Sequence, residues 1–301
     1  YAYNAAELDQ DFGPRPGAAA AMASLLAALR EGGTMPVVVL LPTRPMANPQ
    51  FDTATYDRAA AVASYRANVA WLRQQGALVG VVLDQATVTH ADAEAFFLRG
   101  GAHWGTRGAE IAANEVAAAI REAGIAVGLR PVPHVLESFG KRPWTAELQR
   151  RCPGLPSVDS LDRVAARPAS APGLLDEVPP ADVVLVGTSF SEPAYHLADY
   201  LRVALGTDVT EYATSGGRAL GALSTWLHSD DRAAHRPRVL VWELSVAHLF
   251  GPGRRDAPSG GDLAYYRQLV PAARGDCSDR AVSSATTTGP LPRVLLSERR
   301  R

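Results

Sequence analysis

A serine at the end of an apolar run is the side chain of this sequence best placed to act as a nucleophile. Ser189 closes a Gly-Thr-Ser turn directly after the aliphatic residues 183–186. Pro193 and Ser191 follow, which predicts a helix with Pro193 in its first turn and Ser191 as its cap. A buried strand would then deliver the hydroxyl to a helix N-terminus, where backbone N–H groups and the helix dipole stabilise an oxyanion. The alternative for such a serine is a plain helix cap or a phosphate contact.

His103 is the histidine best placed to serve as a general base. It lies in the glycine-rich segment 99–109, just before a predicted helix, where glycines let backbone and ligand approach closely. A neutral imidazole there could accept the proton of a serine hydroxyl. The alternative is a loop histidine stacked on Trp104. The other histidines fall in helix, strand or loop patterns that favour structural roles: His90, His134, His196, His228, His235 and His248.

Three further groups could complete such a site. The pair Gly216-Gly217 follows a predicted strand and opens a helix, so its N–H groups could form the second half of an oxyanion hole, or simply a turn. Tyr195 follows Ser189 closely enough for its hydroxyl to reach the same pocket. Glu243 ends an apolar strand, which predicts either a buried hydrogen-bonded acid or an ion-pair partner.

Alternating strands and helices must position these residues. Continuously apolar runs predict strands at 36–41, 79–83, 183–187, 209–212 and 239–244. Helical spacing predicts helices at 18–30, 54–75, 91–97, 106–123, 193–205 and 217–227. This alternation predicts a three-layer α/β/α fold with a mostly parallel sheet covered on both faces, and chemistry at the carboxyl ends of the strands.

The predicted domain organisation is one catalytic domain with a C-terminal extension. Residues 1–250 carry the alternating pattern, within which the proline-rich residues 130–180 are expected to be an irregular insertion or connection. Residues 251–301 show no clear periodicity and are expected to be partly loose.

Composition narrows the class of protein. The chain has 301 residues and a formal net charge of −1, which argues against a nucleic-acid groove or a polybasic membrane surface. No apolar run approaches the ~20 residues of a membrane-spanning helix. The chain starts at Tyr1, so we expect a processed or truncated form. Cys152 and Cys277 lie in polar, loop-like surroundings without metal-site spacing; we expect a disulfide in an exported protein, with two free buried thiols as the alternative.

These segments together resemble the SGNH-hydrolase-like O-acetyltransferases of bacterial exopolysaccharides, of the alginate-acetylation AlgJ/AlgX type. Members carry an Asp-x-His-Trp loop before a Gly-Ala helix, and a Gly-Thr-Ser strand end later in the chain. The resemblance spans about residues 15–250. The matching pieces are Gly101–Trp104 with Gly108-Ala109, Leu185–Ser191, Tyr195, Ser215–Gly217 and Val241–Glu243.

The resemblance implies transfer of an acetyl group to polysaccharide hydroxyls through an acetyl-serine intermediate. Ser189 would be the nucleophile, His103 the base, and Tyr195 a positioning group for donor or acceptor. Oxyanion or substrate contacts would come from Trp104, Gly216, Gly217 and Arg218, with no metal or cofactor. The resemblance also implies a periplasmic location, possible association with a membrane complex, and a membrane-bound acyltransferase partner that delivers the acetyl donor. The alternatives are a carbohydrate acetylesterase and a catalytically weak or inactive homologue that binds polysaccharide or assembles a complex.

One position departs from the family pattern. Gly101 stands where the family has the aspartate that would orient the imidazole. Three explanations remain open. Another acid could substitute in space (Asp84, Asp92 or Glu94), Ser189 and His103 could work as a dyad, or the protein could be weakly active or inactive.

Overall fold

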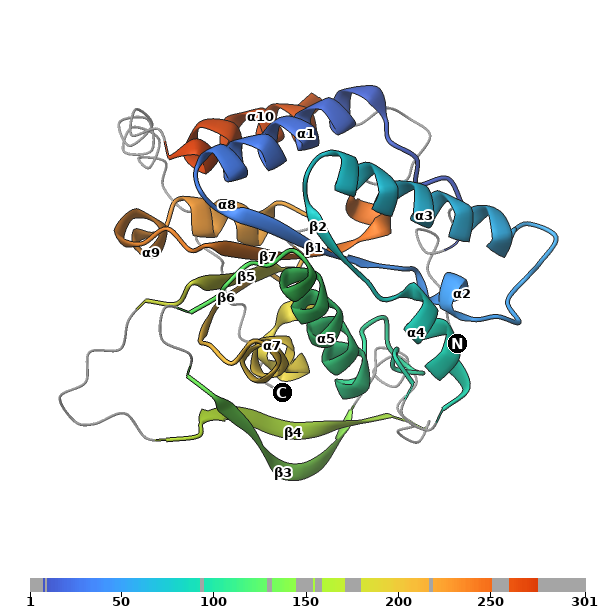
Figure 1. The fold of residues 1–301 in the computed structure, drawn as a ribbon. Coiled ribbons are helices and arrows are strands. Elements are labelled where there is room, and N and C mark those ends of the chain that lie inside the picture. Colours follow the sequence, from blue (N-terminus) through green and yellow to red (C-terminus); the bar gives the residue numbers. More distant parts are fainter. Residues whose placement is uncertain are drawn as a thin grey trace, which may run out of the picture.

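The centre of the fold is a five-stranded parallel sheet, and the sequence predicts chemistry at the carboxyl ends of its strands. We describe a computed structural model for residues 8, 10–92, 95–128, 132–144, 154, 159–170, 180–216, 219–250 and 260–275, with backbone alone for 260–263. The strands are β1 (Met35–Leu41), β2 (Leu78–Val81), β5 (Val183–Gly187), β6 (Val209–Ala213) and β7 (Val239–Ser245). Their order is β2-β1-β7-β5-β6 and all pairings are parallel, which confirms the predicted sheet (Figure 1).

Helices cover both faces of the sheet (Figure 1). One core contains apolar residues of α1 (Pro16–Glu31), α3 (Arg58–Gln74), α8 (Gly221–Leu227) and α10 (Gly260–Arg274). The opposite core contains those of α5 (Thr106–Glu122) and α7 (Leu197–Leu205). Successive residues of a strand contribute to alternate cores: Val38 and Leu40 belong to the first, Val37 and Val39 to the second. This alternation explains why the strands are apolar throughout, and it confirms the three-layer prediction.

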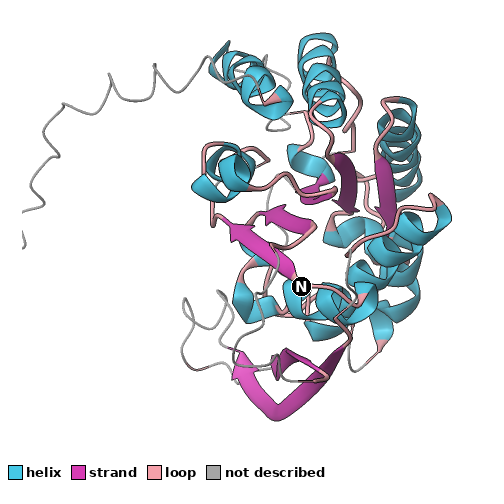
Figure 2. Ribbon diagram, turned by 60° about the vertical axis from the view of Figure 1, so that its left-hand side comes forward, coloured by secondary structure: helices cyan, strands magenta, loops and turns pink. Residues whose placement is uncertain are grey.

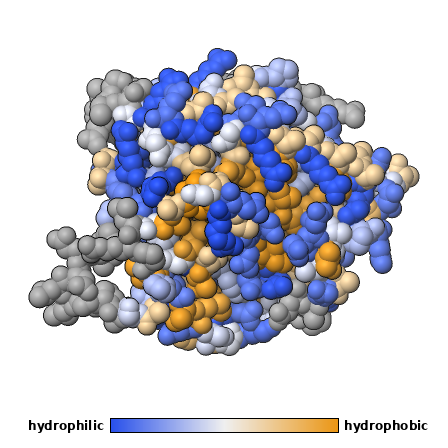
Figure 3. Space-filling model, viewed as in Figure 1, coloured by the Kyte–Doolittle hydropathy of each residue, from blue (hydrophilic) through white to orange (hydrophobic). Residues whose placement is uncertain are grey.

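A two-stranded hairpin replaces the irregular connection expected at 130–180. Strands β3 (His134–Trp144) and β4 (Asp159–Pro168) pair antiparallel, with a register shift between Ser138 and Lys141. The hairpin lies beyond α5 and α7, apart from the central sheet (Figures 1 and 2). Most of β3 is exposed, so its residues need not alternate between apolar and polar, and the usual strand signal is missing. Val135, Leu136 and Phe139 are 37–50% exposed, and apolar side chains reach the surface at the lower edge of Figure 3, where the hairpin lies.

A C-terminal helix packs against the N-terminal helix, which the sequence did not predict. Helix α10 lies beside α1 (Figure 1), and Tyr266, Leu269 and Ala273 are buried in their shared core. Glycines at the start of α10 and Pro271 within it weaken its helical pattern in the sequence. Arg274 Nε donates to Glu31 Oε2 at 2.6 Å. Residues 260–275 are therefore part of the same folded layer as α1 rather than a loose extension.

The remaining elements are short. They are α2 (Arg44–Ala47), α4 (Leu83–Val88), α9 (Asp230–Ala234) and the 3₁₀ turns Thr89–Ala91 and Val246–His248. The helix predicted at 91–97 is wrong: the described residues 95–98 form a loop that bridges Phe97 to Trp104. Within the described ranges, no helix combines the length and the apolar character needed to cross a membrane.

Candidate active site

Ser189 and His103 meet at the carboxyl end of the sheet. His103 Nε2 lies 2.8 Å from Ser189 Oγ, although the two residues are 86 positions apart in the chain. Ser189 follows β5, and His103 belongs to the loop that precedes α5. Both residues are partly exposed, so an external molecule can reach them. The distance and the residue types are those of a nucleophile paired with its general base.

The chain after Ser189 forms two short turns rather than one helix. Residues Ser189–Ser191 and Pro193–Tyr195 are separate 3₁₀ turns, and α7 starts only at Leu197. The helix predicted at 193–205 is wrong at its start because His196 adopts a left-handed conformation (φ 63°). A three-residue turn has little aligned dipole. Oxyanion stabilisation here therefore depends on individual N–H groups rather than on a helix dipole.

Hydrogen bonds to Glu243 hold this segment in place. The side chain is fully buried at the end of β7, and its Oε2 accepts the backbone N–H of Thr188 (2.7 Å), the hydroxyl of Thr188 (2.9 Å) and that of Ser191 (3.2 Å). Ser191 thus binds Glu243 instead of capping a helix, while Thr188 Oγ1 accepts the N–H of Phe190. Burial raises the pKa of Glu243 to about 7, against the lowering effect of these hydrogen bonds.

Gly187 is required by this packing. A Cβ at position 187 would collide with the Ser191 hydroxyl and lie 2.8 Å from Glu243 Oε2. Only glycine lets Ser191 and Glu243 close beneath the turn, which explains the first residue of the Gly-Thr-Ser sequence.

Aromatic rings surround the histidine. The Tyr195 ring stacks on His103 with centroids 4.7 Å apart, and Phe190 lies 4.8 Å from the imidazole. Trp144, at the end of β3, packs 5.4 Å from Tyr195. The sequence did not single out Trp144, since it belongs to a hairpin that showed no strand pattern.

Trp104 supports the site from the core. Its side chain is fully buried and packs edge-on against Phe190 at 5.5 Å. Apolar neighbours enclose the indole and leave it no solvent-facing surface, and its expected substrate contact stays a prediction. Two backbone hydrogen bonds hold the loop on either side of Trp104. They run from Leu98 N to His103 O and from Gly105 N to Phe96 O, both at 2.9 Å.

Close packing explains the glycine of the Gly-Ala pair after this loop, which is Gly108. A Cβ at Gly108 would collide with Phe96 O and lie 2.7 Å from Trp104 Cβ. The first turn of α5 can thus pack directly on the loop that carries His103.

Position 101 is held through its backbone. The buried Arg44, which follows β1, donates from Nη1 to Gly101 O at 2.7 Å. A Cβ built on Gly101 would meet nothing closer than 3.8 Å, where Leu98 and Trp144 lie. The site therefore has room for at least the first atom of a side chain here.

The acids considered as substitutes lie elsewhere or are not described. Asp84 is in α4, exposed, and forms an ion pair with Arg66 at 3.4 Å. The carbonyl of Asp92 accepts a hydrogen bond from Arg99 at 3.1 Å. Glu94 lies outside the described residues.

The predicted oxyanion turn is described only in part. Gly216 has a left-handed conformation (φ 71°) in the turn after β6, and this turn is tied to β5 by the bond from Thr214 N to Gly187 O at 3.1 Å. Gly217 and Arg218 lie outside the described residues, as do Cys152 and Cys277.

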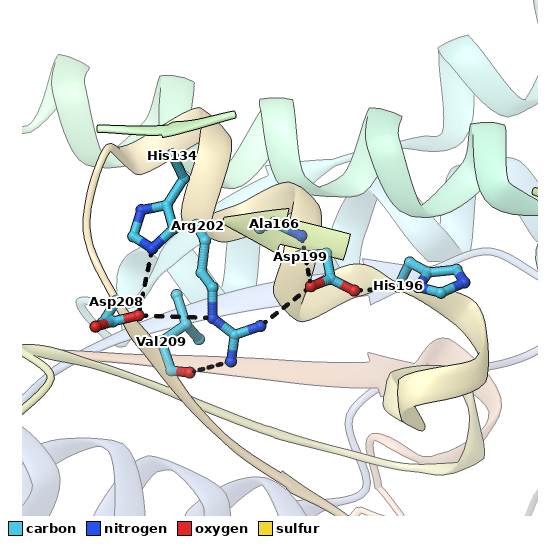
Figure 4. A network of polar contacts seen from close by, with 7 residues as sticks. All are labelled: His134, Ala166, His196, Asp199, Arg202, Asp208 and Val209. Carbon is cyan, nitrogen blue, oxygen red and sulfur yellow. Dashed lines mark hydrogen bonds and ion pairs between the residues drawn. The ribbon is translucent and has the colours of Figure 1, made fainter. Parts of the chain in front are cut away.

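A polar network fastens the hairpin to α7 (Figure 4). Asp199 accepts from Ala166 N of β4 at 3.0 Å, contacts His196 Nδ1 at 3.1 Å and Arg202 Nη1 at 3.3 Å. Burial alone would raise the pKa of Asp199, but these partners together hold it below its ordinary value. Asp208 lies 3.4 Å from His134 Nε2 and continues the network to the start of β3.

In the described part of the chain, no group of three or more His, Cys, Asp or Glu side chains is arranged to hold a metal ion.

Comparisons with known proteins agree on one family. Residues 3–246 match the family model described as SGNH hydrolase-like domain, acetyltransferase AlgX. The alginate biosynthesis protein AlgX of Pseudomonas putida is 27% identical over 94% of this chain and 60% of its own length. The probable alginate O-acetylase AlgJ of the same species is 32% identical over 64% of this chain and 51% of its own length. The chain thus spans about 60% of the AlgX relatives that it matches.

Solved structures show the same fold. Pseudomonas aeruginosa AlgX superposes with a TM-score of 0.73 at 24% identity, covering 90% of this chain and 64% of that one. The O-acetyltransferase domain of Pseudomonas putida AlgJ gives a TM-score of 0.68 at 23% identity, covering 86% of this chain and 94% of that one. Both likenesses confirm the predicted fold class.

The buried carboxyl of Glu243 predicts a pH-dependent stability. Its pKa rises from an ordinary value of 4.5 to about 7 on folding, so the folded state binds the extra proton between these values. The contribution to the free energy of unfolding is fully present below pH 4.5. It is lost, by about 3 kcal/mol in total, as the pH rises through 7. Glu211, whose pKa burial also raises to about 7, adds to the same trend.

Urea unfolding of the wild type and of Glu243→Gln between pH 4.5 and 8 measures this effect. We expect the unfolding free energy of the wild type to fall with rising pH and that of Glu243→Gln to fall less, while Glu211→Gln serves as the control for the second acid. Equal slopes in the wild type and Glu243→Gln would contradict the prediction.

Proposed function

Because this chain belongs to the family of the SGNH hydrolase-like domain of acetyltransferase AlgX, we propose that it is an O-acetyltransferase acting on hydroxyls of an exported polysaccharide. The observation that carries the proposal is the 2.8 Å contact between His103 Nε2 and Ser189 Oγ. The relatives' names assign AlgX to alginate biosynthesis and AlgJ to alginate O-acetylation. A polysaccharide acceptor follows from these names by similarity.

The proposed first half-reaction forms an acetyl-serine. Ser189 Oγ attacks the acetyl carbonyl of the donor while its proton passes to His103 Nε2. The bond between the acetyl carbon and the leaving oxygen then breaks, and the leaving group takes the proton from His103. The N–H of Ser189 and one from the turn at Gly216 and Gly217 would hold the oxyanion between these events.

The proposed second half-reaction transfers the acetyl group. A sugar hydroxyl gives its proton to His103 Nε2 and attacks the acetyl-serine carbonyl. Ser189 leaves with that proton returned from His103, so the enzyme ends in its starting state. Stacking of Tyr195 on the imidazole favours one ring orientation through both halves. Tyr195 acts as a positioning residue in this scheme.

The setting of the reaction is also part of the proposal. We place it in the periplasm, with a membrane-bound acyltransferase partner as the source of the acetyl donor. None of the chemistry assigned to Ser189 and His103 requires a metal or an organic cofactor.

The pair predicts that both residues are needed for transfer. Ser189→Ala and His103→Ala should each lower kcat with a chromogenic acetyl ester and an acidic oligosaccharide by at least about 10³-fold. Ser24→Ala on α1 and His228→Ala on α8 are matched controls, because their hydrogen bonds are to carbonyls of their own helices.

The products separate the candidate functions. Acetylated sugar formed by the wild type and both controls alone supports transfer. Cleavage of the ester without acetylated sugar indicates an acetylesterase that uses water as acceptor. Identical traces from all five proteins would refute both enzyme functions and favour a polysaccharide-binding homologue.

Position 101 gives a second, independent prediction. Gly101→Asp has room for its Cβ, and a carboxylate two residues before His103 would orient the imidazole and stabilise its charged form. In serine proteases, removal of the acid that orients the histidine lowers kcat by about 10⁴-fold. We therefore expect Gly101→Asp to raise kcat by about 10²-fold or more. Gly101→Asn, of equal size but uncharged, should not produce the gain. An unchanged kcat for Gly101→Asp would mean that the acid at this position does not limit the native site.

A further inference from the structure

The carboxylate of Asp159 binds the backbone of the loop that carries His103. Its Oδ1 accepts the N–H of Arg99 at 2.8 Å and its Oδ2 accepts that of Gly100 at 2.7 Å. Asp159 is the first residue of β4, so the partner of this loop comes from about 60 residues further along the chain. Two charge-assisted bonds from one carboxylate fix both the position and the tilt of the two peptide groups.

The same loop is held from its other side by Arg44. The guanidinium is buried and donates to the carbonyl of Gly101 at 2.7 Å. Three successive residues of the loop are therefore bound by side chains from two distant elements, through N–H groups at 99 and 100 and a carbonyl at 101. The bonds end two residues before His103.

The hairpin also touches the serine side of the site. Trp144 pairs with Asp159 in the hairpin register, and its ring packs on Tyr195, which stacks on His103. Arg142 donates to Ala194 O at 3.4 Å and lies 5.2 Å over the Trp144 ring. One end of the hairpin thus contacts both segments that supply the reacting groups.

Bonds to the backbone matter in this loop because it contains two adjacent glycines. Gly100 and Gly101 have no side chains to pack, and glycine loses more conformational freedom on ordering than any other residue. Bonds to their peptide groups are the remaining way to hold the backbone in one conformation. A displacement of about 1 Å in a catalytic group can cost about 10²-fold in rate.

We propose that Asp159 is a positioning residue for His103, and that its carboxylate holds the histidine loop in register with Ser189 by binding the peptide groups of Arg99 and Gly100. The inference rests on the proposed function for its effect on rate. Its effect on the loop is independent of any activity.

The variants Asp159→Ala and Asp159→Asn test this role against Asp162→Asn. Asp162 lies on the same strand, and its carboxylate contacts Lys141 at 3.7 Å rather than the loop. Asp159→Ala should lower kcat for the acetyl ester by about 10- to 100-fold with KM changed less than twofold. Asp159→Asn, which keeps one acceptor, should fall between Asp159→Ala and the wild type, and Asp162→Asn should match the wild type.

Two readouts do not need turnover. Hydrogen exchange of the peptide spanning 95–105 should be at least about 10-fold faster in Asp159→Ala than in the wild type and in Asp162→Asn. The imidazole NMR signals of His103 should shift in Asp159→Ala because its bond to Ser189 is weakened. If Asp159→Ala does not fold, as judged by circular dichroism, Asp159→Asn supplies the same comparisons.

The outcomes separate this inference from the proposed function. Unchanged exchange and unchanged His103 signals would overturn the positioning role, whatever the activity. Shifted His103 signals in a protein whose wild type transfers no acetyl group would refute the function and keep the positioning role. A wild-type kcat in Asp159→Ala, in an active protein, would overturn the inference even with faster exchange.

Discussion

The buried carboxyl of Glu243 is the interaction on which the site depends. An acid without solvent contact is costly unless its oxygens are bound, and here three donors from Thr188 and Ser191 converge on Oε2. Glu243 lies near the carboxyl end of β7, the central strand, which is paired on both sides by β1 and β5. The turn that presents Ser189 is therefore fixed to the centre of the sheet. Its geometry does not depend on a long helix behind it, which explains how the chain can follow the serine with two short turns and a left-handed residue.

The histidine side is built differently. The loop of His103 is anchored by its own buried side chains, which are Phe96, Phe97, Leu98 and Trp104. Partners at distant positions hold it as well: Arg44 after β1, Asp159 on β4, and Tyr195 after the serine turn. In the proposed function, a nucleophile held by the sheet thus faces a base whose loop is held by several segments. Changes in the hairpin should affect the position of His103 more than that of Ser189, because Asp159 of the hairpin binds the histidine loop while Glu243 of the sheet binds the serine turn.

Local patterns predicted the sheet and the two reacting residues, since apolar strands and glycine-bounded turns leave signals within ten residues. The pairing of Ser189 with His103 was predicted from the ability of a histidine in a glycine-rich loop to act as base for a serine, and from the resemblance to the AlgJ/AlgX-type acetyltransferases. Asp159 and Trp144 were missed because β3 is mostly exposed, β4 is only partly buried and both are rich in charge. Neither strand therefore shows alternation, and their partners are far away in the chain. The break at His196 was missed because a left-handed histidine has no sequence signature comparable to that of glycine. Helix α10 was missed because its glycines and Pro271 weaken its periodicity.

The packing of α10 on α1 places the ends of both helices at the same edge of the sheet. Both helices end near the start of β1: a Cβ at Gly32 would collide with Ala273 O, and Arg274 binds Glu31, four residues before Met35, where β1 begins. The described C-terminal end therefore lies at the amino edge of the sheet, opposite Ser189. For a polymeric acceptor this arrangement has a topological consequence. In the proposed function, helices α1 and α10 therefore do not lie between the polymer and the edge of the sheet that carries Ser189.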